Sequence, residues 1–426
     1  MTEKFLQYIW QNKLFAAQNL TTTDGQNVEV IDAGRPNSDA GPDFFNAKIK
    51  IDGQMWAGNV ELHLRASDWN KHKHSTDKAY DSVILHVVKD ADMPVFNTQK
   101  QPVCQMCLNY PSHLEKQYEE LIFNSRKTRC EQYISNIQSI HIRTCLSALL
   151  TERLSEKTEF IETILQSNNN NWEETFYITL ARNFGFGLNA FPFEQLAKST
   201  PLPVLAKHKN SLSQIEAILF GQAGFLASQA AQKDEYVLKL EQEYAFLKHK
   251  FSLASMDNSQ WKLLRVRPVN FPTVRIAQFA AIIHQSSKLF SKILQSAALS
   301  DLQQLFAAKV SGYWETHYLL NEPSPRRSKK LGADAVNTIL INTVVPFLFA
   351  YGKHTNDNAL QDRALSLFEH IPAEKNSTIT EWARAGIPAQ NAGDTQALLQ
   401  LKTRYCDRND CLRCRIGYKI LSRQPV

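Results

Sequence analysis

The sequence lacks long apolar runs and a leader-like start. Its first ten residues show none of the cationic start, apolar core and small-residue cleavage site of a signal peptide. The nearest candidate for a membrane span, residues 339–350, is shorter than the roughly 20 residues that cross a bilayer, and it contains Pro346. No fixed repeat period is visible, which argues against a solenoid. These absences predict a cytoplasmic protein without a membrane partner.

Cysteine is scarce and odd in number, with seven in 426 residues. In a reducing compartment such thiols stay free or bind metals rather than form a disulfide framework. Apolar residues make up 43% of the chain and aromatic residues 10%, enough to fill the cores of two or three domains. The net charge of +6 suits a polyanionic partner such as DNA or RNA, although many proteins carry a mild excess without one.

The first 110 residues predict a small mixed β-sheet with flanking helices. In chain order, the expected elements are a helix at 3–10, strands at 28–31, 44–51 and 54–65, a short helix within 67–81, and a strand at 82–88. The last of these strands is apolar and β-branched, as in the centre of a sheet.

From residue 111 onward the pattern changes to helical periodicity. Helices are expected at 146–164, 172–183, 213–226, 234–247, 274–294, 299–306, 336–351 and 358–367. We therefore predict an α+β protein in which a mixed-sheet domain (1–110) precedes a mostly α-helical domain (111–426).

Two acidic residues stand at the ends of neighbouring predicted strands. Asp43 follows Gly41-Pro42, and Glu61 lies in the strand that returns after the Asp52-Gly53 turn. Paired carboxylates can hold a hard cation such as Mg²⁺ or Mn²⁺ against a phosphate. The sequence therefore predicts that Asp43 and Glu61 bind a divalent ion.

The register of this hairpin decides whether the two carboxylates can meet. With a two-residue turn, Asp43 lies opposite Leu62 rather than Glu61, so a hairpin without a bulge places the two carboxylates on opposite faces. A β-bulge would shift the register by one residue, and Gly58 is a residue type that bulges favour. Alternatively, Asp43 lies just before its strand and escapes the alternation.

His63 lies two residues after Glu61, so the two side chains share a face of the strand. With an ordinary pKa near 6.5 its imidazole is mostly neutral, and it can accept a proton from water or bind Mn²⁺ or Zn²⁺. Asp43, Glu61 and His63 are the expected catalytic residues. The opposite interpretation is that Asp43 is a structural residue, that Glu61 is a solvated charge, and that any activity has been lost.

The next polar segment adds four candidate substrate-binding residues. His72 and His74 can form a metal site or line a path for phosphate, or they can belong to a hydrated loop. Lys78 and Tyr80, on the short helix that follows, can face the same cleft. His86 lies inside an apolar strand and is expected to be a hydrogen-bonded core residue.

Near the C-terminus, Cys406, Cys411 and Cys414 follow a C-x4-C-x2-C pattern. Thiolates at these separations can converge on zinc or an iron–sulfur cluster. The candidates for a fourth ligand are a histidine, Cys104, Cys107, Cys145 and Cys130. We favour Cys130, because the 104/107 pair lies in an extended segment and points to opposite faces. The alternative is a set of unliganded thiols on a basic tail.

Arg265, Arg267 and Arg275 surround Phe271 in a proline-bearing segment. Arginines in a rigid turn can grip phosphates, and these three are further candidate substrate-binding residues. They can equally anchor the turn through hydrogen bonds to carbonyls at helix ends.

Taken whole, the chain resembles a bacterial family known as a domain of unknown function, DUF2851. The features that carry the resemblance are Gly41-Pro42-Asp43-Phe44, residues 58–63, Asp68-Trp69 with His72 and His74, residues 267–273, and the closing cysteines. The resemblance runs over nearly the full length and implies the two-part layout, but no reaction.

The first 110 residues also resemble the PD-(D/E)XK nuclease core. The order of elements matches, as do Gly41-Pro42-Asp43 and Glu61-x-His63, with histidine in place of lysine. This resemblance implies a restriction-endonuclease-like fold and a metal-dependent nuclease acting on DNA or RNA. Some iron–sulfur nucleases add one cysteine before and three after such a core, whereas Cys130 follows the core here. The alternatives are an inactive nuclease-like binding or scaffold protein, and a small-substrate metallohydrolase that uses His63, His72 and His74.

Overall fold

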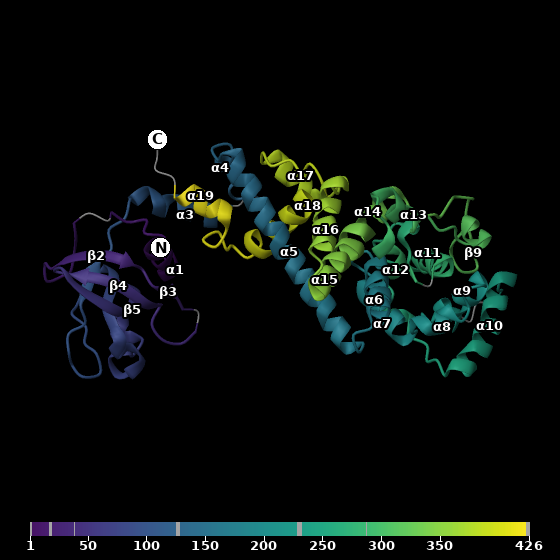
Figure 1. Cartoon of the computed structure of the whole chain (residues 1–426), viewed down its shortest axis with the longest axis horizontal. Coiled ribbons are helices and arrows are strands. Elements are labelled where there is room, and N and C mark those ends of the chain that lie inside the picture. Colours follow the sequence, from purple (N-terminus) through teal and green to yellow (C-terminus); the bar gives the residue numbers. More distant parts are fainter. Residues whose placement is uncertain are drawn as a thin grey trace. The chain divides into compact units, whose positions relative to one another are not determined.

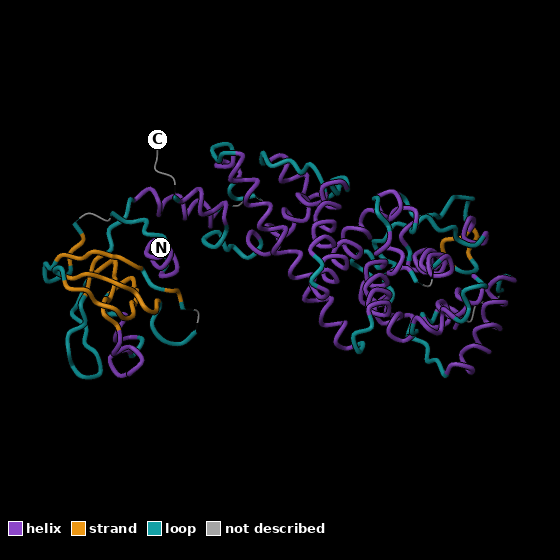
Figure 2. The backbone as a smooth tube through the Cα atoms, viewed as in Figure 1, coloured by secondary structure: helices purple, strands orange, loops and turns teal. Residues whose placement is uncertain are grey.

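The computed structural model describes residues 2–16, 19–37, 39–124, 128–227, 232–286 and 288–422, and it divides into two compact units. Unit 1 comprises Met1–Cys145, Ala385–Ile387 and Leu401–Val426, and unit 2 comprises Leu146–Arg384 and Pro388–Gln400. Strands are concentrated in the N-terminal part, and helices make up most of the remaining chain (Figures 1 and 2). The predicted α+β class, with a mixed sheet followed by a largely helical region, is confirmed.

Unit 1 is built on a mixed sheet that nearly closes on itself. Its strands, within the described residues, are β1 (Leu20–Thr21), β2 (Asn27–Asp32), β3 (Arg35–Pro36), β4 (Phe44–Ile51), β5 (Gln54–Arg65), β6 (Val83–Asp90) and β7 (Gln105–Cys107). The order is β1-β2-β4-β5-β6-β7, with β3 also beside β4; the β5–β6 and β6–β7 pairs are parallel and the others antiparallel. An isolated bridge from Thr22 to Met106 joins the two ends of this order.

Helix α1 (Glu3–Gln11) covers part of this sheet near β5. Its start is capped by Thr2, whose Oγ1 accepts a hydrogen bond from the Phe5 N–H at 3.3 Å. Phe5, Leu6 and Trp10 are fully buried, and the Trp10 indole N–H donates to the Ala33 carbonyl at 3.0 Å. The amphipathic pattern thus fixes the rotation of α1 over the sheet.

The connection from β5 to β6 is a chain of short helices. They are α2 (Asp68–Lys71), η1 (His74–Thr76) and η2 (Lys78–Ser82). Trp69 is fully buried beneath them, and its indole N–H donates to the Phe96 carbonyl at 3.0 Å. After the sheet, unit 1 continues with α3 (Ser112–Phe123) and α4 (Glu131–Ile134), and the C-terminal segment adds η8 (Leu401–Cys406) and α19 (Arg415–Leu421).

Unit 2 is helical around one apolar core. Helix α5 (Ser139–Ser167) enters it from unit 1, and the other helices are α6 (Trp172–Phe184), α7 (Ala190–Ser199), α8 (Leu202–Ala206), α9 (Leu212–Gln222), α10 (Glu235–Phe251), α11 (Pro272–Gln285), α12 (Leu289–Gln295), α13 (Leu299–Gln304), α14 (Ala333–Ile339), α15 (Val345–Thr355), α16 (Asn358–His370), α17 (Ser377–Arg384) and α18 (Ala392–Gln400). Each predicted helix is present, but the one expected at 274–294 is divided. Ser286 takes an extended conformation there and ends α11.

Helices α14 and α15 are continuous through a π-helical turn, η7 (Leu340–Val344). Within the described part of the chain, this 23-residue helix alone is long and apolar enough to cross a membrane by length and composition. Ile341, Val344 and Phe347 are fully buried in the core of unit 2, which accounts for the apolar composition.

Candidate metal centre

A β-bulge in the β4–β5 hairpin brings Asp43 level with Glu61. Ala47 pairs with Gly58 but Phe44 pairs with Val60, so β4 carries one extra residue. Asn46 absorbs this residue with a left-handed φ of 57°. The predicted bulge is confirmed, although it lies in β4 rather than at Gly58. Asp43 also lies just before β4, as the alternative required.

Gly58 has a different role, which is close packing against β6. A Cβ at this position would lie 2.3 Å from the Ile84 side chain and 3.0 Å from the Ser82 carbonyl oxygen. Only glycine fits there without a shift of the neighbouring strand.

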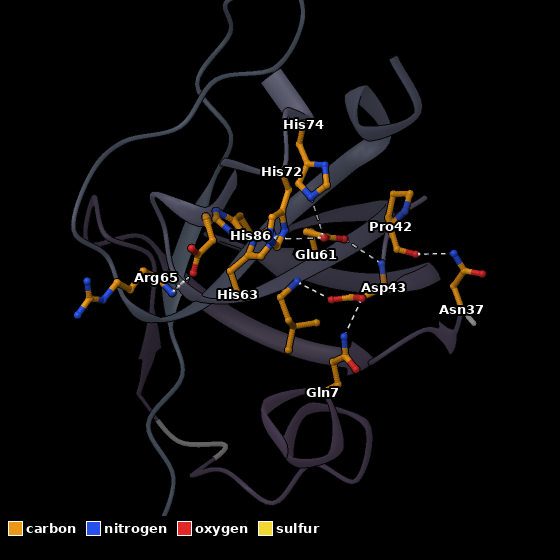
Figure 3. A network of polar contacts seen from close by, with 12 residues as sticks. Gln7, Asn37, Pro42, Asp43, Glu61, His63, Arg65, His72, His74 and His86 are labelled. Atoms are coloured by element: carbon orange, nitrogen blue, oxygen red, sulfur yellow. Dashed lines mark hydrogen bonds and ion pairs between the residues drawn. The ribbon is translucent and has the colours of Figure 1, made fainter. Parts of the chain in front are cut away.

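The two carboxylates are locked together through the backbone (Figure 3). The Asp43 N–H donates to Glu61 Oε2 at 2.9 Å, and the Leu62 N–H donates to Asp43 Oδ2 at 3.0 Å. The other Asp43 oxygen, Oδ1, accepts from the Gln7 amide of α1 at 2.8 Å. Asp43 therefore connects α1, β4 and β5 through its hydrogen bonds. Glu61 Oε1 takes no part in these bonds and faces the groups beside it.

Three imidazoles converge beside this Glu61 oxygen. His63 Nε2 lies 3.1 Å from His72 Nδ1 and 3.6 Å from Glu61 Oε1, and His74 Nε2 lies 3.3 Å from the same oxygen. One ring nitrogen from each histidine lies within 4.8 Å of the other two. His63 and His74 are buried and His72 is exposed, so the group has one side open to solvent.

The short helices after β5 place the second and third imidazoles. Helix α2 ends at Lys71, and Lys73 takes a left-handed φ of 65°. This tight turn lets His72 and His74 both point back toward His63 (Figure 3). Tyr80 of η2 stacks on His74, with ring centroids 3.6 Å apart, and fixes its plane.

Behind His63 lies a second layer of hydrogen-bonding groups. His63 Nδ1 is 2.9 Å from His86 Nε2, and His86 Nδ1 is 3.3 Å from the Gln105 amide. This chain has two consistent proton arrangements, since each neutral imidazole donates at one nitrogen and accepts at the other. With Gln105 Nε2 as it lies, the amide donates to His86 Nδ1, His86 donates to His63 Nδ1, and the His63 proton lies on Nε2. With the amide rotated by 180° the order reverses, and the His63 Nε2 lone pair points into the site.

Burial disfavours the charged forms of these groups. It lowers the pKa of His63 to about 2, with the nearby imidazoles of His86, His74 and His72 adding to the effect. It also lowers the pKa of His86 to about 3. Burial and the charge of Glu61 raise the pKa of Asp43 to about 7.

The donor set fits a transition-metal ion. Neutral imidazoles with a carboxylate suit Mn²⁺, Fe²⁺ or Zn²⁺, whereas Mg²⁺ prefers oxygen ligands. His74 Nε2 is buried and makes no well-aligned hydrogen bond, although Glu61 Oε1 lies 3.3 Å away, and a cation bound between them would relieve this costly arrangement. The His63–His86–Gln105 chain is the kind of outer support that orients a ligating imidazole.

The other predicted substrate-binding residues are Lys78, Tyr80 and three arginines of unit 2. Lys78 is exposed on η2, two residues from Tyr80, whose pKa burial and nearby carboxylates raise to about 12. In unit 2, Arg265 and Arg267 are exposed. Arg275 is buried and lies over the Phe186 ring, and it donates to the side-chain oxygens of Asn270 and Gln278. It therefore anchors the turn, through side chains rather than through the helix-end carbonyls that were expected.

Some site residues were not expected. Gln7 lies on the polar side of α1, one helical turn from both Glu3 and Gln11, and Gln105 lies in a strand too short to predict. His86 was expected as a hydrogen-bonded core residue, and it is fully buried, but its contact with His63 makes it part of the site. A histidine inside an apolar strand needs a polar partner, and that was the available signal.

No curated protein and no solved structure matches this chain. A family model described as "Protein of unknown function (DUF2851)" matches residues 3–377, which include the hairpin, the imidazole cluster and most of unit 2. The chain therefore belongs to the DUF2851 family.

Proposed function

We propose that unit 1 is a metal-dependent hydrolase of phosphodiester bonds, whose divalent ion is held by His63, His72 and His74. The observation that carries this proposal is the convergence of three imidazole nitrogens within 4.8 Å beside the buried Glu61 carboxylate. A bound ion would polarise the phosphoryl oxygen and make a bound water more acidic.

The side chains of the chain itself supply the remaining functions. Glu61 Oε1 faces the imidazole group and is placed to accept a proton from an attacking water. Asp43 holds Glu61 in position through its backbone N–H. His72 and the exposed Lys71, Lys73 and Lys78 form a basic, solvent-facing side that suits a phosphate-bearing substrate.

The PD-(D/E)XK resemblance supports a nucleic-acid substrate. When the two-residue strands β1 and β3 are set aside, the order α1, β2, β4, β5, α2, β6 is the helix, three strands, helix, strand order of that core. Asp43 precedes the middle strand of the three and Glu61-x-His63 lies on the last. His63 replaces the lysine of that pattern, which on this proposal exchanges a fixed cation for a metal ligand.

A cleavage assay with matched histidine variants tests the proposal. Purified full-length chain is incubated with Mn²⁺, Zn²⁺ or Mg²⁺ and with single- and double-stranded DNA and RNA. We expect cleavage with Mn²⁺ or Zn²⁺, a loss of at least about a hundredfold in Glu61→Gln and His72→Ala, and no change in His249→Ala, an exposed histidine of α10.

Two outcomes would redirect the proposal. Metal-independent, salt-dependent binding without cleavage would identify a nucleic-acid-binding module, an alternative that the internal hydrogen bonding of both Asp43 oxygens favours. Cleavage of small esters but not of nucleic acid would identify a small-substrate metallohydrolase at the same residues.

A further inference from the structure

A second group of metal-ligating side chains lies in unit 1, in segments far apart in the sequence. Cys130 immediately precedes α4, Cys406 ends η8, and Cys414 immediately precedes α19. Cys411 lies in the turn between the last two. The C-terminal segment packs back on the earlier part of unit 1, where α19 contacts α3 (Figure 1).

The four thiols share one neighbourhood. Burial raises the pKa of the Cys130 thiol well above its usual value, and the thiols of Cys406, Cys414 and Cys411 add to the effect. Burial likewise raises the pKa of Cys406 to about 12, and the thiols of Cys414 and Cys411 again add to the effect. Such mutual influence requires side chains that lie close together.

The backbone around the C-terminal cysteines is shaped to present sulfur atoms. Asn409 takes a left-handed φ of 58°, and the Asp410 N–H donates to the Tyr405 carbonyl at 2.9 Å. A Cβ on Gly417 would lie 2.1 Å from the Cys411 carbonyl oxygen, so only glycine lets the turn approach α19. The backbone N–H groups of Ile416 and Gly417 favour the thiolate form of Cys414.

Arg129, next to Cys130, points to an anion at this place. Its Nη1 is buried without a hydrogen-bond partner, and its charge acts on Cys411. A buried guanidinium nitrogen is stable beside negative charge, and neutral thiols do not supply it. Four thiolates on a metal centre carry that charge.

We propose that Cys130, Cys406, Cys411 and Cys414 bind an iron–sulfur cluster. Each thiol gives up its proton as its sulfur forms a bond to iron. The C-x4-C-x2-C spacing with a fourth, distant cysteine is one that iron–sulfur proteins use. Cys414 also lines a cavity of about 570 Å³.

The spacing of the sulfur atoms favours a cluster over a single zinc ion. Tetrahedral zinc with bonds of about 2.3 Å holds its sulfurs about 3.8 Å apart. Across the described residues, the histidine group alone has three ligand atoms within 4.8 Å of one another. No three cysteine sulfurs among the described residues lie that close, a spacing that is compatible with the wider ligand set of a polynuclear cluster.

Metal and sulfide analysis of anaerobically purified full-length chain tests this proposal independently of any hydrolase activity. We expect iron and acid-labile sulfide in the wild type, with the visible absorption of sulfide-to-iron charge transfer. Both should fall at least tenfold in Cys130→Ser and Cys411→Ser. Cys104→Ser, a half-buried thiol next to β7, is the matched control and should retain both.

Arg129→Gln keeps all four ligands, so it tests the site even if the cysteine variants fail to fold. We expect the cluster to remain and its reduction potential to become more negative, because a nearby positive charge is removed. Iron and sulfide absent after anaerobic reconstitution, or undiminished in folded Cys411→Ser, would overturn the proposal. Zinc alone at these cysteines would overturn the iron–sulfur assignment.

Discussion

The two candidate metal centres of unit 1 are assembled in different ways. His63 lies on strand β5, and His72 and His74 lie on the short helical segment that follows it, so one local stretch of chain holds a ring nitrogen of each within 4.8 Å of the other two. Cys130 and the C-terminal cysteines come from distant segments, with no sheet to hold them. We infer that the imidazole site is preorganised by the fold, whereas the cysteine site contributes to the fold by binding its metal.

The largest expected effect is on stability when the cysteine centre is removed. Cys130→Ser should destabilise the C-terminal segment by about 5 kcal/mol or more, because metal-binding free energy at a site absent from the unfolded chain is folding free energy. Hydrogen exchange of α19 measures the loss. If α19 stays protected in Cys130→Ser, the contrast between the two centres fails.

The next effect is on metal affinity at the imidazole centre. His63→Ala should weaken Mn²⁺ or Zn²⁺ binding by at least about a thousandfold, or about 4 kcal/mol, while α19 stays protected. Isothermal titration calorimetry measures the affinity. Unchanged binding would show that the three imidazoles do not act together.

Unit 2 contains a buried carboxyl, Glu216, that belongs to neither candidate metal centre. It therefore shows what burial alone does to a titratable group. Burial raises the pKa of Glu216 to about 7 from 4.5. The unfolded chain therefore loses this proton first, and the free energy of unfolding should fall by up to about 3 kcal/mol as pH rises from 4.5 to 7. Denaturant titrations of Glu216→Gln should lose this slope, and those of Glu369→Gln, which removes an exposed carboxyl, should keep it.

The smallest expected effect concerns the second layer behind His63. His86→Leu removes the partner of His63 Nδ1 and should weaken metal binding roughly 10- to 100-fold, or about 1.4–2.8 kcal/mol. A competitive chelator assay resolves this range. A loss as large as that of His63→Ala would instead indicate that His86 is itself a ligand.

Much of the sheet could be predicted from the sequence because its long strands carry clear alternation. Strands β4 and β5 begin and end where the pattern placed them, and the required bulge is present. Strands β1, β3 and β7 are two or three residues long, too short for any period to appear. The near-closure of the sheet was therefore not predictable.

The residues of the candidate site were singled out from the sequence, but in other roles, because Asp43 and Glu61 were expected to bind the ion. His63, His72 and His74 stand close in the sequence, and their convergence depends on one left-handed residue, Lys73. The roles of Gln7 and Gln105 depend on how α1 and β7 pack, which no local pattern reveals.

The measurement that tests the central claim most directly is the metal content of wild-type and His72→Ala chains purified with Mn²⁺ and Zn²⁺ supplied. His72 is exposed, so its loss leaves the core intact. We predict one fewer Mn²⁺ or Zn²⁺ ion per chain in His72→Ala than in the wild type, with any iron and sulfide unchanged. Equal Mn²⁺ and Zn²⁺ contents in the two chains would contradict the account.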